Sequence, residues 1–350
     1  MTRLDRRTSL SLLAAGMASL AGCSETSDET DDTDDSDSSG SDDSESVADS
    51  DHELLDDGDL PSYASLLRET DRSSSFYGAI AFGASFQRAD LGDDEQPTDS
   101  LLVNPIAFAQ LSSFGLAQLG DSPAVEAFNA HGETSDASAF VYADGVYAIT
   151  GTYERDDLTD ALEETGYDPA ALGDAYAVSV DGESGEAVGV TDELFAYSYP
   201  SENDAFDPAT AVEGTVATAA GERKPKYEID DEFAGLLRAD EADGISLGLY
   251  APDEAFTADD LENDQTDAEA DELGFQFDAI EGAAGIHQQL SLDGGSATAN
   301  AVVSYRDDDR VDVDRLESSF GTDADDVETV RDGTAVAIEA AYDDTAVEEE

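Results

Sequence analysis

Cysteine is nearly missing from this sequence, which has one, Cys23, among 350 residues. One cysteine excludes an internal disulfide, and it cannot by itself supply the thiolates of a structural zinc site. Tryptophan is absent, and methionine occurs only twice. The apolar residues are therefore mostly small, and any core must be built by close packing of alanine and valine.

Recognisable catalytic motifs are missing too. The sequence contains no Walker loop, no dinucleotide-binding fingerprint and no Gly-x-Ser-x-Gly nucleophile elbow. Its three histidines, His52, His131 and His287, form no pair with metal-ligand spacing. We therefore expect no metal and no cofactor, and we favour a protein that is not an enzyme. A catalytic triad assembled from distant residues remains an alternative.

Positive charge is scarce. The chain has 15 basic residues against 85 acidic ones, which gives a formal net charge of −70. Repulsion between so many carboxylates opposes folding in dilute buffer, whereas at about 1 M salt the Debye length is only about 3 Å. The composition resembles that of haloarchaeal proteins, and it excludes nucleic acid as a partner because phosphates would be repelled. An acidic surface for a basic partner or calcium is the alternative.

The N-terminus has the order of features of an export signal. Arg6-Arg7 precedes an apolar run from Leu10 to Ala21, which is shorter than the roughly 20 residues that span a bilayer. The arginine pair resembles a twin-arginine (Tat) signal. Leu20-Ala21-Gly22-Cys23 resembles the lipobox of lipoproteins, in which the cysteine is lipidated and becomes the new N-terminus. The alternative is a buried N-terminal helix that ends in cysteine.

These features predict where the protein lies. Residues 1–22 would be the signal peptide, and lipidated Cys23 would hold the protein on the extracytoplasmic face of the cell membrane, its membrane partner. Residues 23–53 are rich in Ser, Asp and Glu with little that is apolar, so we expect an extended, disordered stalk. Once Cys23 is lipidated, no thiol remains for other chemistry.

From residue 54 to about 345 the pattern predicts one α+β domain of antiparallel hairpins with flanking helices. Asp144-Gly145 is a hairpin turn signal between two apolar runs. Pro208 to Ala220 reads as a helix that Asp207 caps. Leu101 to Leu119 has helical apolar spacing and is expected in the core, with a partner-binding or membrane-surface role as the alternative. Further helices and strands are expected at residues 63–69, 76–86, 123–129, 176–180, 186–190, 194–199, 230–237 and 244–250.

The pattern of hairpin, helix and hairpin occurs twice, which suggests an internal duplication. The first unit covers about residues 54–250, and the second covers about 280–345. In the second, a hairpin turns at Asp293-Gly294-Gly295, a helix follows at residues 313–320, and a last hairpin turns at Asp332-Gly333. An acidic insertion, Asp253 to Glu272, separates the units.

Three segments carry a resemblance to a known family. They are the run Gly151-Thr152-Tyr153-Glu154-Arg155-Asp156-Asp157-Leu158, the helix from Glu213 to Gly221, and Asp230-Asp231-Glu232-Phe233 before a leucine pair. Together they resemble haloarchaeal Tat-exported lipoproteins, over roughly residues 60 to 345. The resemblance implies location and fold type, and it implies no activity and no catalytic residues.

Two weak features are candidate contacts for a ligand. Phe195, Tyr197 and Tyr199 alternate and so share one face of a strand. They could form an aromatic platform for a ligand, or they could take part in ordinary sheet packing. The cluster Arg223, Lys224 and Lys226 follows a helix end. There it would interact with the helix dipole and form ion pairs. Alternatively, it would bind an anion or an acidic partner.

The anchor, the stalk and the missing motifs favour a binding or envelope-interaction lipoprotein whose protein or small-molecule partner is unknown. A solute-binding subunit of a transporter is the first alternative, and it would show two α/β lobes with parallel sheets. An extracellular hydrolase is the second, and it would show a buried cluster of Ser, His and an acid.

Overall fold

The computed structural model describes residues 58–82, 98–133, 139–201, 206–239, 244–263, 274–293 and 296–342. The expected signal peptide, Cys23 and the whole of the expected stalk, residues 23–53, lie outside these residues.

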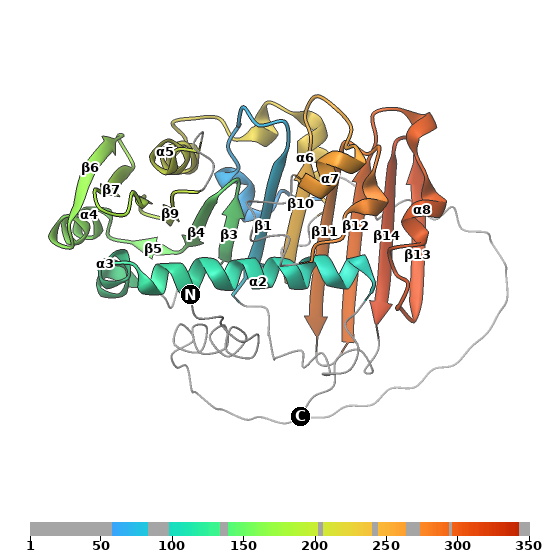
Figure 1. Ribbon diagram of the computed structural model, residues 1–350, viewed down its shortest axis with the longest axis horizontal. Coiled ribbons are helices and arrows are strands. Elements are labelled where there is room, and N and C mark those ends of the chain that lie inside the picture. Colours follow the sequence, from blue (N-terminus) through green and yellow to red (C-terminus); the bar gives the residue numbers. More distant parts are fainter. Residues whose placement is uncertain are drawn as a thin grey trace, which may run out of the picture.

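A single antiparallel sheet of twelve strands organises the fold, in the order β13-β14-β12-β11-β10-β1-β3-β4-β9-β8-β7-β6 (Figure 1). A separate pair, β2 and β5, lies outside it. The strands are β1 Ser75–Ala81, β2 Gly132–Glu133, β3 Ala139–Ala143, β4 Val146–Thr150, β5 Thr152–Tyr153, β6 Tyr167–Leu172, β7 Ala177–Asp181, β8 Ala187–Val190, β9 Leu194–Ser198, β10 Ile245–Tyr250, β11 Gly285–Asp293, β12 Ser296–Ser304, β13 Asp326–Asp332 and β14 Ala335–Tyr342.

Helices cover both faces of the sheet, which confirms the predicted α+β class with antiparallel hairpins. The α-helices are α2 Ser100–Asp121, α3 Ala124–His131, α4 Arg155–Glu164, α5 Pro208–Ala219, α6 Asp231–Leu237, α7 Ala258–Asn263 and α8 Val313–Glu317. The 3-10 turns are η2 Ser62–Leu66, η4 Lys226–Glu228, η6 Asp278–Ile280 and η7 Asp308–Arg310. Two apolar clusters lie under α2, α3, α4 and α8 on one face, and a third lies under η2, α5 and α6 on the other.

Local signals explain several elements. The β3–β4 hairpin turns at Asp144 and Gly145, whose positive φ angles of 48° and 89° fit a tight primed turn. The Asp207 side chain accepts a hydrogen bond from Ala209 N at 3.1 Å and so caps α5, as predicted. Among the described residues, α2 is long and apolar enough to span a membrane by length and composition, but its buried side contributes to the core.

Some elements differ from the expectation. Residues 62–66 form a 3-10 turn, and β1 ends at Ala81; residues 83–86 of the expected longer strand lie outside the described residues. The sequence analysis missed β6, which contains Pro169 at a register shift. Proline is tolerated there because β6 is the last strand of the sheet, where a missing N–H breaks no inner ladder.

The two halves of the sheet share a pattern of strand pairing, while the internal duplication itself stays a prediction. In each half a lead strand, β1 or β10, pairs with a hairpin, β3–β4 or β11–β12. A short helix, α4 or α8, then leads to a meander whose last strand, β9 or β14, returns to pair with the second hairpin strand. The first meander has four strands and the second has two.

The sequence before each lead strand repeats as well. Tyr63-Ala64-Ser65-Leu66-Leu67-Arg68 and Phe233-Ala234-Gly235-Leu236-Leu237-Arg238 share the Ala, both Leu and the Arg. The lead strands pair with a two-fold symmetric register, since Tyr77 faces Gly248 and Gly78 faces Leu247. We therefore define the first unit as η2 to α5 and the second as α6 to β14, which moves β10 from the first unit, where the sequence pattern placed it, to the second.

Candidate functional site

Among the described residues, α6 is the α-helix that packs on one sheet surface of the second unit, and no counterpart of α5 lies over the rest of it, although Val302 and Ala337 on this surface are only 9% and 2% exposed. Val302 of β12 lies opposite Ala337 of β14, which in turn lies opposite Val330 of β13. Residues opposite each other in register share a face. We call the surface that these strands present on the α6 side the open face. It comprises Thr298, Asn300, Val302, Ser304, Asp326, Glu328, Val330, Asp332, Ala335, Ala337, Glu339 and Ala341.

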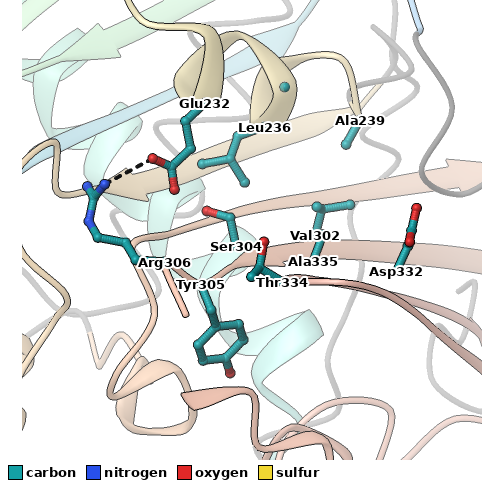
Figure 2. Close-up of a pocket in the computed structure, with 11 residues that line it drawn as sticks. Glu232, Leu236, Ala239, Val302, Ser304, Tyr305, Arg306, Asp332, Thr334 and Ala335 are labelled. Carbon is teal, nitrogen blue, oxygen red and sulfur yellow. Dashed lines mark hydrogen bonds and ion pairs between the residues drawn. The ribbon is translucent and has the colours of Figure 1, made fainter. Parts of the chain in front are cut away.

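A pocket of about 500 Å³ lies where the open face meets α6. Figure 2 shows Glu232, Leu236 and Ala239 from α6 and the chain just after it on one side of the space, with Val302 and Ser304 of β12 on the other. The ring of Tyr305 points away from the other labelled side chains. It belongs to the apolar cluster on the opposite face, where burial raises its pKa. The pocket lining is therefore mixed, with Leu236, Val302 and Ala335 beside the buried hydroxyl of Ser304.

Polar atoms without partners gather at this surface. Ser304 Oγ, Asn300 Oδ1 and Arg306 Nε are buried and make no hydrogen bond in the described part of the chain. Native proteins satisfy nearly all such groups, because each one left unpaired costs about 1–3 kcal/mol. These three atoms are therefore the strongest indication that something else completes the surface.

Charges at the pocket are mostly negative. Arg306 donates to Glu232 at 3.1 Å and to the backbone oxygens of Ala251 and Pro252 at 2.7 and 2.6 Å, which fixes its guanidinium at one end (Figure 2). Asp332 lies at the other end of the pocket. Glu328 and Glu339 lie directly opposite each other farther along the open face. The ion pair neutralises Glu232, so the surface keeps four carboxylates, those of Asp326, Glu328, Asp332 and Glu339.

In the first unit the equivalent surface is closed. Ala148 of β4, Ala196 of β9 and Gly189 of β8 lie under α5 and are buried. The fit is tight, since a Cβ added to Gly189 would lie 2.6 Å from Val212 Cγ1 of α5. The two units thus build the same three-strand surface and cover it differently.

The aromatic residues Phe195, Tyr197 and Tyr199 do not form an open platform. Phe195 and Tyr197 are fully buried under α3, and Tyr199 packs at the edge of the same cluster. The ring of Phe195 lies 4.9 Å from that of Phe128, and the ring of Tyr197 stacks 5.4 Å from that of Tyr147. These rings fill the core, so a ligand could contact them only if the helices that cover this cluster moved away from the sheet.

The basic residues also separate. Arg223 pairs with Glu213 at 3.3 Å, and Lys224 is exposed. Lys226 is only 5% exposed; it donates to Ser75 Oγ at 2.8 Å, and its ammonium lies 4.9 Å from the ring centres of Phe233 and Tyr250. Burial lowers the pKa of Lys226. The three residues therefore do not present a common basic surface.

A buried polar cluster bears on the hydrolase alternative. Ser122 Oγ donates to Glu186, with 2.8 and 2.7 Å to its two oxygens, and lies 3.0 Å from Tyr167 Oη. Burial raises the pKa of Glu186. The Ser122 oxygen also accepts from Ala124 N, so the cluster ties the α2–α3 junction to β8. None of the hydrogen bonds of this cluster in the described chain involves a histidine.

Other catalytic arrangements also fail to emerge from the described residues. His131 ends α3, as predicted, and His287 Nδ1 lies 3.4 Å from Tyr77 Oη in the core. No group of three His, Cys, Asp or Glu residues suited to a metal ion occurs within the described ranges. The single antiparallel sheet also differs from the two parallel-sheet lobes expected of a transporter's solute-binding subunit.

The comparisons with known proteins add little. No family model matches the chain, and no curated protein matches it. Among solved structures, crystal form I of TP0453 has a TM-score of 0.40 at 7% identity, covering 82% of this chain and 95% of that chain. Crystal form IV of TP0453 has a TM-score of 0.38 at 7% identity, covering 82% and 94%. Likeness at these TM-scores carries no argument about function.

Proposed function

We propose that the chain is a lipid-anchored, extracytoplasmic lipoprotein of a halophilic archaeon that works by binding, and that the open face with its pocket is the binding site. The observation that carries this proposal is the set of unpaired buried atoms, Ser304 Oγ, Asn300 Oδ1 and Arg306 Nε, on the one described three-strand surface that lacks its helix.

The size of the pocket supports a binding role. Its volume of about 500 Å³ lies within the roughly 300–1,000 Å³ of typical ligand sites. Its lining combines apolar side chains, such as Leu236 and Val302, with polar groups that could orient a ligand by hydrogen bonds. A partner that hydrogen-bonds the unpaired atoms would recover the cost of burying them.

The N-terminal features support the location. A diacylated cysteine gives the two chains that stable membrane attachment requires. Ser24 to Asp51, about 28 residues, would allow the domain to move no more than roughly 95 Å from the lipid. Within this reach the open face could contact other components of the envelope. The net charge of −70 supports a setting in molar salt, because only there is the repulsion screened.

A thermal-shift screen tests the binding role. The full chain in molar salt would be heated with panels of amino acids, sugars, polyols and short peptides. One class should raise the melting temperature, since a ligand at 100 times its Kd adds about 2.7 kcal/mol of stability.

The control is Ala335→Trp, which would fill the pocket, beside Leu172→Trp on the far edge strand β6. The shift should vanish in the first variant and persist in the second. If no class shifts the wild type, or if the shift survives in Ala335→Trp, the open face is not the binding site. In that case ordered water would be the partner of the unpaired atoms.

A further inference from the structure

The occupant of the open face can be inferred from the first unit. There α5 fills the equivalent position against η2, β4, β7, β8 and β9, and it does so with small residues. Its buried residues are Pro208, Ala211, Val212, Gly214, Thr215, Val216, Ala217 and Thr218. A helix with so narrow a side can approach a flat sheet closely. The fold thus already contains one example of what closes this three-strand surface.

The repeat assigns each contact of α5 a counterpart. η2 corresponds to α6, which forms one wall of the pocket. Ala148 and Ala196 are paired across β4 and β9, and Val302 and Ala337 are paired in the same way across β12 and β14. Gly189 pairs with Ala196, as Val330 pairs with Ala337. The pocket therefore lies where a second helix of the α5 kind would meet α6.

Two differences specify the chemistry of the occupant. Val330 stands where Gly189 gives room to Val212 and Val216, so the occupant needs smaller side chains at those two points. The pair Ala187 and Ser198 is replaced by the opposed carboxylates Glu328 and Glu339. Like charges directly opposite on neighbouring strands are destabilising, and a cation between them would remove the repulsion.

We infer that the open face receives a helix from a partner protein, with an Ala- and Gly-rich side against Val302, Val330 and Ala337 and with lysine or arginine near Glu328 and Glu339. The inference rests on the proposed function, because it names the partner class of the same site. It would also supply backbone or side-chain partners for Ser304 and Asn300.

Charge excludes two nearer candidates for the occupant. A second copy of the chain, with 15 basic residues against 85 acidic ones, offers few cations to contact Glu328 and Glu339 directly. Residues 343–350, which follow β14, read Asp-Asp-Thr-Ala-Val-Glu-Glu-Glu and would add five carboxylates to it. A basic helix from another protein is the complementary choice, and its contacts with the carboxylates lie within the short range that survives molar salt.

A synthetic peptide derived from α5 tests the inference. The probe has the sequence of residues 208–219 with Val212→Ala, Glu213→Ala and Val216→Ala, and with two lysines added at each end. Its binding to the full chain in molar salt would be followed by fluorescence anisotropy. A control peptide carries Thr215→Pro as well, which prevents a continuous helix. A second control keeps Val212 and Val216.

The helical probe should bind with a Kd below about 1 mM, and both control peptides should bind roughly tenfold more weakly. Glu328→Lys with Glu339→Lys in the protein should cost a further tenfold or more. Glu163→Lys with Glu164→Lys, an equal charge change on α4 in the first unit, should cost nothing.

Equal binding of the proline peptide, or no effect of the open-face charge reversal, would overturn the helical partner. So would a failure to bind below about 1 mM, the threshold set for the probe. If a solute still protects the wild type in the thermal screen but not Ala335→Trp, the binding site stands and only the helical occupant is wrong. If neither probe nor solute binds, both proposals fail.

Discussion

Removing the Asp99 carboxylate should release the contacts of α2 with the segment after α8 and with the end of β14 in the second unit. Asp99 is 0% exposed and lies at the start of α2, where Oδ1 accepts from Leu101 N at 3.0 Å and caps the helix. Oδ1 also accepts from Gly321 N at 3.0 Å, after α8. Oδ2 accepts from Asp323 N at 3.2 Å and from Tyr342 Oη at 2.8 Å, at the end of β14.

The magnitude follows from these four bonds. Loss of an N-cap costs about 1 kcal/mol. Gly321 N and Tyr342 Oη would be left partly or fully buried without a partner, at about 1 kcal/mol or more each, whereas Asp323 is exposed and its N–H can bond to water. Asp99→Ala should therefore lose roughly 3 kcal/mol of unfolding free energy, out of the roughly 5–15 kcal/mol typical of a domain. Asp99→Asn keeps one acceptor oxygen and should lose about half as much.

Urea denaturation of the full chain in molar salt measures both losses. The matched control is Asp207→Ala, which removes the exposed cap of α5 and should cost only about 1 kcal/mol. If Asp99→Ala costs no more than Asp207→Ala, then the bonds from α8 and β14 to Asp99 do not hold the second unit together, and the reasoning is refuted.

Three further predictions concern other parts of the chain. Burial raises the pKa of Glu186, so ionisation of this carboxyl opposes folding. The stability of Glu186→Gln relative to wild type should therefore increase progressively as the pH rises above about 4.5. A stability difference that stays constant with pH would contradict this. Gly189→Val should cost about 1–3 kcal/mol by urea denaturation because its side chain would meet Val212 of α5, and an unchanged stability would deny that α5 is tightly seated. Cys23→Ser should move the protein from the membrane to the soluble fraction, and full retention in the pellet would rule out lipid anchoring through this residue.

Local signals in the sequence predicted most individual elements. The Asp144-Gly145 turn, the Asp207 cap and the apolar spacing of residues 101–119 each act over a few residues, and each gave the correct element. Strand β6 was missed because Pro169 normally argues against a strand, and only its place at the sheet edge makes it acceptable.

The site was beyond the reach of sequence patterns for a physical reason. The surroundings of Val302, Ser304 and Ala337 depend on which strands pair and on which elements lie over the sheet. The local periodicity of the sequence predicts neither. A usable signal did exist in the repeated Ala-x-Leu-Leu-Arg segments at residues 64–68 and 234–238. They mark the equivalent positions of η2 and α6, and so indicate which surface of the second unit corresponds to the one that α5 covers in the first.

The candidate aromatic and basic residues show that a sequence pattern can also suggest a ligand site where the side chains are buried. Phe195, Tyr197 and Lys226 have side chains common in ligand sites, but alternation along a strand does not say whether a face is solvated or covered. In the fold, α3 covers the first two, while Lys226 lies between the rings of Phe233 and Tyr250.

Thiol labelling in intact cells tests the central claim, that the open face is occupied in the envelope. Val330→Cys places a thiol at the centre of the open face, and Leu172→Cys places one on β6 at a position that is 81% exposed. A membrane-impermeant maleimide would be applied to cells and to purified protein. The account predicts that Val330→Cys reacts at least tenfold more slowly in cells than when purified, while Leu172→Cys reacts equally in both. Equal rates for Val330→Cys in cells and in solution would contradict it.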